Sequence, residues 1–194
     1  MQPPAEHVHW LFATGLLLLG LCLLAEAVVG TEVWRQRAWR AYVWPGLAFA
    51  LGLFMWPVMV FYTNSTIHML AHGSWAEVMT FAGAVELARV RGKLHSSAWS
   101  LAMAAALAVS GVAFLVHEQN SWYFMRSAFL HHLLGWILLV AAVFPLVRAV
   151  RPRSNVAAAG FALTFVVLAV ALYCDRDAAP VFGHISPLAG APHR

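Results

Sequence analysis

Histidines occur in short groups whose spacing could bring several imidazoles to one site. His68 and His72 are four residues apart, and His131 and His132 are adjacent. Residues four apart in a helix share a face and lie about one turn from each other. Neutral imidazole is a ligand for zinc, copper and iron. The pattern therefore predicts a metal or haem site whose candidate ligands are His68, His72, His131 and His132, and His117 would reach the same depth from a further segment.

The segments that must position these histidines are apolar enough to cross a membrane. The chain has 194 residues, of which 62% are hydrophobic and only 10% charged. An ordinary soluble domain has about 25% charged residues, so water is not the solvent of this chain. A span needs about 20 apolar residues, and the sequence predicts spans near 10–29, 41–62, 67–88, 97–116, 129–148 and 156–174. We expect one all-α domain, a polytopic membrane bundle of six transmembrane helices in contact with the lipid bilayer.

Basic residues predict the orientation of this bundle. The loops after the first, third and fifth spans hold Arg35, Arg37, Arg40, Arg89, Arg91, Lys93, Arg148, Arg151 and Arg153, whereas the opposite side holds Arg126, Arg176 and Arg194. Lysine and arginine accumulate in cytoplasmic loops. We therefore expect a multi-pass protein of the plasma membrane with both termini extracytoplasmic. The formal charge of +4 reflects orientation and does not indicate nucleic-acid binding.

Histidine shows the opposite asymmetry. The extracytoplasmic side holds His7, His9, His68, His72, His117, His131, His132, His184 and His193, and His95 alone falls on the other side. An ionisable group within a span is costly unless it is paired, hydrated or bound to a ligand. We interpret His72, His117 and the pair at 131 and 132 as ligands, and leave His68 open between the two roles. We expect His7, His9, His184 and His193 to be ordinary interfacial residues.

The acidic residues of the spans are expected to have structural roles. Glu26 and Glu86 fall near the arginine-rich side, where Arg35 and Arg89 could neutralise them. Glu77 lies about 140° around its helix from the imidazole face, because each residue advances by about 100°. We therefore interpret Glu77 as a structural residue that hydrogen-bonds to another helix, and proton relay is the alternative.

Haem b bound between two helices is the first functional interpretation. His72 would ligate the iron opposite His131 or His132, and Gly73, Gly111 and Gly135 would make room for the macrocycle. The protein would then pass electrons between quinol in the bilayer and an extracytoplasmic redox partner.

A short run on the fifth span resembles known haem-binding membrane proteins. The sequence His131-His132-Leu133-Leu134-Gly135-Trp136 is similar to helix starts in cytochrome b561-like and copper-resistance-D-like proteins. The resemblance covers about one helix. Those families commonly carry ligands at two depths, whereas the other half of this chain offers only His95. The resemblance therefore implies a single haem.

Three other interpretations remain open. An outward-facing copper-binding or delivery protein would use His68, His72, His117, His131 and His132 together with Met59, Met69 or Met125, because thioethers beside imidazoles suit Cu(I). An accessory subunit of a larger membrane complex would use its histidines at an interface. A membrane zinc hydrolase would need three histidines on zinc, with Glu118 or Glu77 as base. The sequence therefore leaves open whether the protein is an enzyme.

Overall fold

A computed structural model describes residues 4–62, 66–116 and 125–176 of the chain. Their helices are α1 (Ala5–Val29), α2 (Thr31–Arg35), α3 (Arg40–Tyr62), α4 (Thr66–Val90), α5 (Ser100–Val116), α6 (Met125–Val150) and α7 (Asn155–Tyr173), with a 3-10 turn at Ser97–Trp99. These boundaries lie close to the predicted ones. The described part of the chain is all-α, as predicted, and contains no strand.

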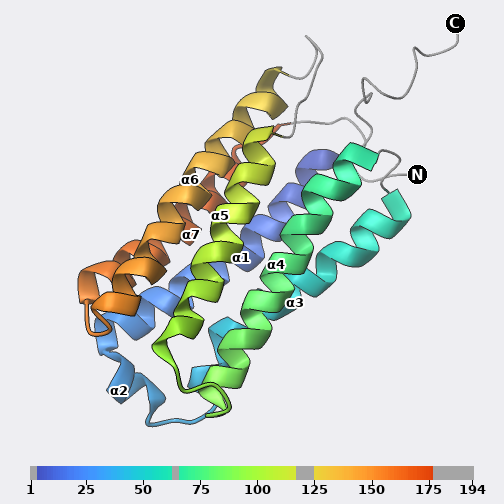
Figure 1. Cartoon of the computed structure of the whole chain (residues 1–194). Coiled ribbons are helices and arrows are strands. Elements are labelled where there is room, and N and C mark those ends of the chain that lie inside the picture. The colour runs from blue at the N-terminus through green and yellow to red at the C-terminus, as the bar shows by residue number, and fades with distance from the viewer. Residues whose placement is uncertain (1–3, 63–65, 117–124, 177–194) are drawn as a thin grey trace, which may run out of the picture.

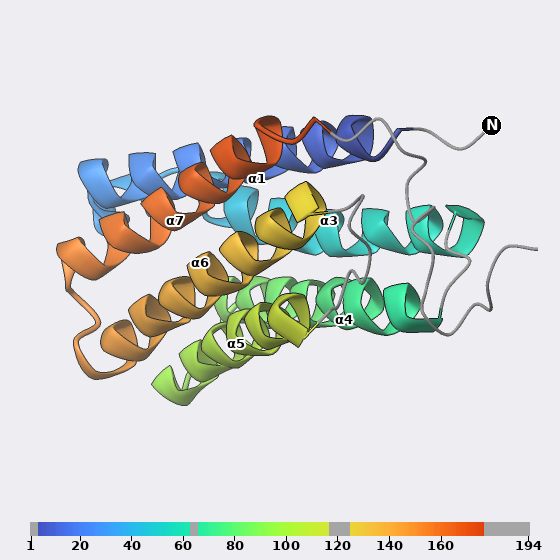
Figure 2. The same ribbon diagram turned by 90° about the horizontal axis from the view of Figure 1, so that it is seen from above.

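The six long helices run side by side, and each is antiparallel to the next (Figure 1). The most extensive contacts are those of α1 with α7, α3 with α4, and α5 with α6. Figure 2 shows α1 beside α7. Helices α4 and α5, α6 and α7, and α1 and α3 are also in contact. The bundle is therefore a closed ring in the order α1, α3, α4, α5, α6, α7. Residues far apart in sequence, at the start of α1 and the end of α7, become neighbours.

The outer surface of the ring is largely apolar, as expected for helices that contact lipid. Large apolar side chains are exposed on every long helix, including Leu18, Phe54, Phe81, Val109, Trp136 and Val167. Four helices are long and apolar enough to cross a membrane: Ala5–Val29, Arg40–Phe61, Ala128–Val150 and Asn155–Tyr173. Ser100–Val116 is a shorter apolar helix. These features agree with a membrane protein in contact with a bilayer.

Glycines allow neighbouring helices to approach closely. A Cβ added at Gly83 would stand 2.5 Å from the backbone nitrogen of Phe49, so α4 lies directly against α3. A Cβ at Gly111 would stand 2.9 Å from the carbonyl oxygen of Gly135, and the reverse also holds. Small residues have this function at helix contacts within membranes. The haem interpretation requires Gly111 and Gly135 to make room for the macrocycle. In the structure α5 and α6 pack against each other at these two glycines.

The middle of the ring is filled by apolar side chains. Leu19, Met79, Leu107 and Phe165 are among the largest fully buried side chains. Phe161 and Phe165 pack edge to face with ring centroids 5.0 Å apart. Each end of the ring opens into a cavity, and the two ends have different chemistry.

Candidate metal centre

Three imidazoles from three helices meet at one end of the ring. His9 belongs to α1, His72 to α4 and His131 to α6, and the last two are buried, with 6% and 3% exposure. The ring centroids of His72 and His131 are 5.9 Å apart, and those of His9 and His131 are 6.4 Å apart. Helices α4 and α6 lie on either side of α5 in the ring, so these imidazoles meet in its interior. Phe114 of α5 packs against both His72 and His131.

The three imidazoles line a cavity of about 60 Å³. Its remaining walls are apolar or aromatic and include Phe12, Trp75, Phe114 and Phe165. A water molecule requires roughly 10–15 Å³ of such space, so the cavity has room for a few waters or one metal ion. The histidines therefore stand in a small, largely apolar chamber inside the bundle.

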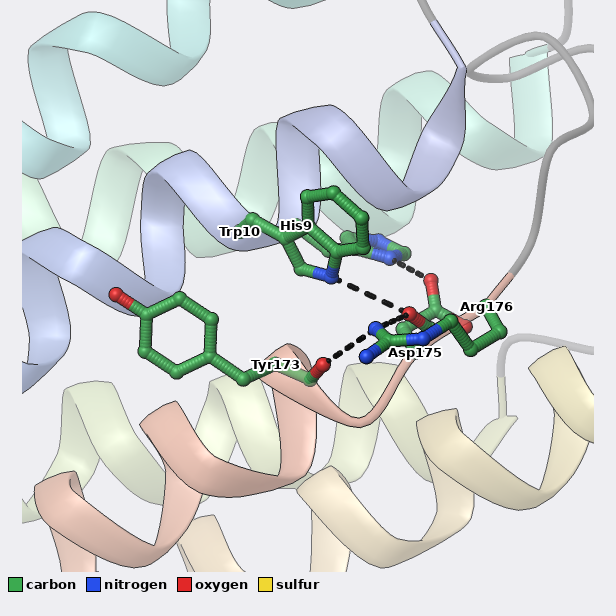
Figure 3. A network of polar contacts seen from close by, with 5 residues as sticks. All are labelled: His9, Trp10, Tyr173, Asp175 and Arg176. Carbon is green, nitrogen blue, oxygen red and sulfur yellow. Dashed lines mark hydrogen bonds and ion pairs between the residues drawn. The ribbon is translucent and has the colours of Figure 1, made fainter.

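His9 is oriented by a carboxylate from the opposite end of the chain. Its Nδ1 lies 2.5 Å from Oδ2 of Asp175, which is buried just beyond α7 (Figure 3). An ionised carboxylate only accepts hydrogen bonds, so Nδ1 donates to it. That tautomer leaves Nε2 of His9 with a free lone pair. Metal-binding histidines usually donate their second nitrogen to a carboxylate or carbonyl in this way.

The same network joins the ends of α1 and α7. The indole nitrogen of Trp10 donates to the carbonyl of Asp175 at 3.2 Å, and the guanidinium of Arg176 lies over the Trp10 ring (Figure 3). Arg176 also donates to the carbonyl of Tyr173 at 2.8 Å. The hydroxyl groups of Thr14 and Tyr173 are 2.7 Å apart. These contacts hold the carboxylate at a defined position beside His9.

Two thioethers line the deeper part of the chamber. Met55 of α3 and Met79 of α4 are buried cavity residues. Met79 follows His72 by seven residues, which places it about 10 Å further along the helix axis. Met59 is also buried, with its methyl group against Gly73. Imidazole and thioether side chains thus line the same chamber.

The spacing of the imidazoles limits which ligand they can share. A metal lies about 2 Å from each ligating nitrogen, so two imidazoles on opposite sides of one ion have centroids roughly 6 Å apart. The rings of His72 and His131 are close enough for one ion to lie between them, and their planes are 84° apart. Within residues 4–62, 66–116 and 125–176, however, no group of three or more His, Cys, Asp or Glu side chains has an arrangement that could hold a metal. A pair of imidazoles is therefore the core of the candidate site.

The predicted site residues take different positions. His72 and His131 meet in the chamber, whereas the adjacent His132 is exposed. His68 belongs to α4, but its side chain is outside the described part, as are His117 and the side chain of Met125. Met69 is exposed on α4. Only two of the five predicted histidines can thus be placed in the chamber.

The acidic residues agree in part with expectation. Glu26 pairs with Arg35 at 3.7 Å, and Glu86 pairs with Arg89 at 2.7 Å, which confirms the predicted neutralisation. Glu77 is exposed on the outer face of α4 and does not line the chamber. The chamber and the acidic side chains of the spans are therefore separate features.

Sequence reasoning missed His9 and Asp175 as site residues. His9 looked like an interfacial histidine, and Asp175 follows the last apolar span without a motif. One signal was available, because His9, Phe12 and Leu16 recur at helical spacing and so share a face. Antiparallel threading also places the end of the last span level with the start of the first. Together these signals could have paired His9 with Asp175.

Comparison with known proteins gives no relative from which a role could be transferred. No family model, no curated protein and no solved structure matches this chain. The chemistry of the chamber is therefore the basis for assigning a function.

Proposed function

We propose that this chain is a multi-pass protein of the plasma membrane that binds Cu(I) in the histidine chamber and delivers it to an extracytoplasmic partner. One observation supports this most strongly: imidazoles from three helices and the thioethers of Met55 and Met79 line a single small cavity. Six transmembrane helices with both termini outside are part of the proposal. The arginine asymmetry and the place of α4 between α3 and α5 support this topology.

The donor set favours copper over zinc. Thioether and thiolate sulfurs are soft ligands that select Cu(I), whereas imidazole serves several metals. Zinc takes four ligands in structural sites, and in catalytic sites it takes three from the protein and a water. Cu(I) accepts low coordination numbers, which suits a pair of neighbouring imidazoles such as His72 and His131. Because neutral imidazoles and thioethers carry no charge, the bound ion would retain its single positive charge within the bundle.

The chamber fits haem b less well. A cavity of about 60 Å³ is many times smaller than a porphyrin. The contact between Gly111 and Gly135 also closes the space beside His131. Haem binding would therefore require α4, α5 and α6 to move apart, and the copper interpretation needs no such movement. An absorption spectrum of the purified protein distinguishes the two, because haem gives a Soret band and Cu(I) does not absorb there.

Delivery is assigned to His9 because it is the most accessible of the three imidazoles. Its side chain is 20% exposed, whereas that of its partner Asp175 is 5% exposed. An ion that leaves the pair formed by His72 and His131 would meet the Nε2 of His9 next. By accepting a hydrogen bond from Nδ1, Asp175 selects the neutral tautomer in which Nε2 carries the lone pair. His9 would thus pass the ion between the chamber and a partner.

The proposal is tested by anaerobic Cu(I) titration of the detergent-purified protein against a chromophoric chelator. His72→Ala and His131→Ala should each weaken binding by more than the roughly 10–100-fold expected for loss of a second-shell group. His132→Ala is the matched control, because it removes the neighbouring, exposed imidazole and should leave the affinity unchanged. Circular dichroism of each variant verifies that the helices are retained.

The site would be refuted if His72→Ala or His131→Ala folds and still binds Cu(I) as tightly as the wild type. The same holds if all three alanine variants lose affinity equally, because exposed histidines would then be responsible. A Soret band that survives purification would replace copper by haem.

An accessory-subunit role has one observation in its favour. Glu77 lies near the middle of α4, and its side chain is exposed beside apolar residues such as Phe81. A charged group in a span usually faces a partner or a water-filled space, because exposure to lipid is costly. A membrane partner that covers this face of α4 would remove the cost. If Glu77→Leu leaves a purified complex with other subunits intact, this second function loses its support.

A further inference from the structure

A second cavity lies at the opposite, arginine-bearing end of the ring. Its volume is about 350 Å³, within the range of small-molecule sites. Residues of all seven α-helices line it, and Leu23, Trp44 and Phe161 form part of its apolar wall. Because Phe161 packs against Phe165 of the histidine chamber, apolar side chains separate the two cavities. The two sites can therefore be tested independently.

Positive charge exceeds negative charge on the wall of this cavity. Three arginines line it from three separate helices: Arg35 from α2, Arg89 from α4 and Arg148 from α6. The two carboxylates that also line it are already engaged, Glu26 with Arg35 and Glu86 with Arg89. Among the described residues, Arg148 makes no ion pair. The cavity thus keeps a cationic side chain that no acidic residue in the described part of the chain neutralises.

The start of α7 adds to this positive potential. The side chain of Ser154 caps the helix by accepting a hydrogen bond from the backbone N–H of Ala157. Ala158, in the first turn of α7, lines the cavity. The N-terminus of a helix carries a partial positive charge that favours anions. The helix terminus and Arg148 therefore act on the same space with the same sign.

We propose that this cavity binds a phosphate-bearing anion, with Arg148 as its main contact. Guanidinium groups bind phosphate oxygens through two parallel N–H donors, which suits them to this ligand. Arg89 and Arg148 stand in the last turns of α4 and α6. Basic pockets between membrane helices bind lipid headgroups. A phospholipid headgroup and a soluble phosphate share this chemistry, and the cavity can admit either.

The test measures thermal unfolding of delipidated, copper-free protein in detergent. One arm adds phosphatidylglycerol in mixed micelles, with phosphatidylcholine as its control. The other arm adds inorganic phosphate at constant ionic strength, with chloride as its control. A ligand that binds the folded state at about ten times its Kd lowers the unfolded fraction roughly tenfold. Stabilisation by phosphatidylglycerol alone identifies a lipid, and stabilisation by inorganic phosphate as well identifies a soluble ligand.

Variants show whether the cavity is responsible. Arg148→Gln should remove the stabilisation, whereas Arg37→Gln should leave it intact, because Arg37 is exposed and does not line the cavity. Arg148→Lys keeps the charge but not the paired N–H donors, so it should weaken anion binding about tenfold. This variant tests the contribution of Arg148 if Arg148→Gln does not fold. The proposal is overturned if neither anion stabilises the protein, or if the variants at 148 and 37 respond alike. Since copper is absent throughout, failure here leaves the copper proposal untouched.

Discussion

Asp175 offers the sharpest test of how the chamber works. Its carboxylate accepts from Nδ1 of His9 at 2.5 Å and is 5% exposed, so the bond is shielded from water. Asp175→Asn keeps the size and an acceptor oxygen but removes the charge. The change should therefore weaken the hold on His9 without removing any proposed copper ligand. Two quantities, the Cu(I) affinity and the free energy of unfolding, should respond differently.

The expected magnitudes follow from the two functions of this bond. A hydrogen bond to a charged group contributes about 1.5–3 kcal/mol and a neutral one about half as much, so the protein should lose roughly 1 kcal/mol of stability. Loss of a second-shell carboxylate typically weakens metal binding by about 10–100-fold. At about 1.4 kcal/mol per factor of ten, the loss in binding free energy should equal or exceed the loss in stability.

The assay pairs Cu(I) titration with thermal unfolding of the metal-free protein. Arg176→Gln is the matched control, because Arg176 belongs to the same network but donates only to backbone carbonyls and the Trp10 ring. This control should lower stability and leave the Cu(I) affinity within about twofold of the wild type. If Asp175→Asn destabilises the protein but binds Cu(I) normally, the carboxylate only joins α1 to α7. The proposed orientation of His9 would then be refuted.

Three further predictions concern the bundle. Gly83→Ala should destabilise the protein by about 1–3 kcal/mol, because its Cβ would stand 2.5 Å from the backbone of α3. Gly46→Ala is the control and should be neutral or slightly stabilising, because nothing lies within 4 Å of the added Cβ. Equal unfolding temperatures for the Gly83 and Gly46 variants would contradict the close contact between α3 and α4. Glu86→Gln should leave Cu(I) affinity unchanged, because Glu86 lines only the other cavity, and loss of copper in a folded variant would extend the site inward. In intact cells, a membrane-impermeant maleimide should label the exposed native Cys174. It should not label a cysteine placed by Arg91→Cys in an otherwise cysteine-free protein, because position 91 is exposed on the side proposed to be cytoplasmic. Labelling of both positions would refute the proposed topology.

Sequence reasoning predicted the helices well because lipid imposes a simple rule. A backbone in hydrocarbon must satisfy its own hydrogen bonds, so an apolar run of suitable length becomes a helix. The helix bounds therefore lie near the ends of the apolar runs. The ion pairs of Glu26 with Arg35 and of Glu86 with Arg89 were also predictable, because these residues occur close together in the sequence at the ends of those runs. Segment 67–88 differs from the other predicted spans because it contains four ionisable residues, His68, His72, Glu77 and Glu86. It forms a helix because it packs within the ring, between α3 and α5.

The residues that meet in the chamber depended on tertiary structure. Helical periodicity indicates that His131 and His132 face different directions, but not which of them faces inward. It also cannot show that His9 lies beside Asp175, 166 residues away, since that contact exists only when α1 and α7 close the ring. The sequence by itself determined which segments are helical and that most arginines and histidines fall near opposite ends of these helices, because these features depend on the composition of each segment. Only the tertiary structure decided which imidazoles and thioethers share a cavity, because the rotation of each helix about its axis depends on packing against its neighbours.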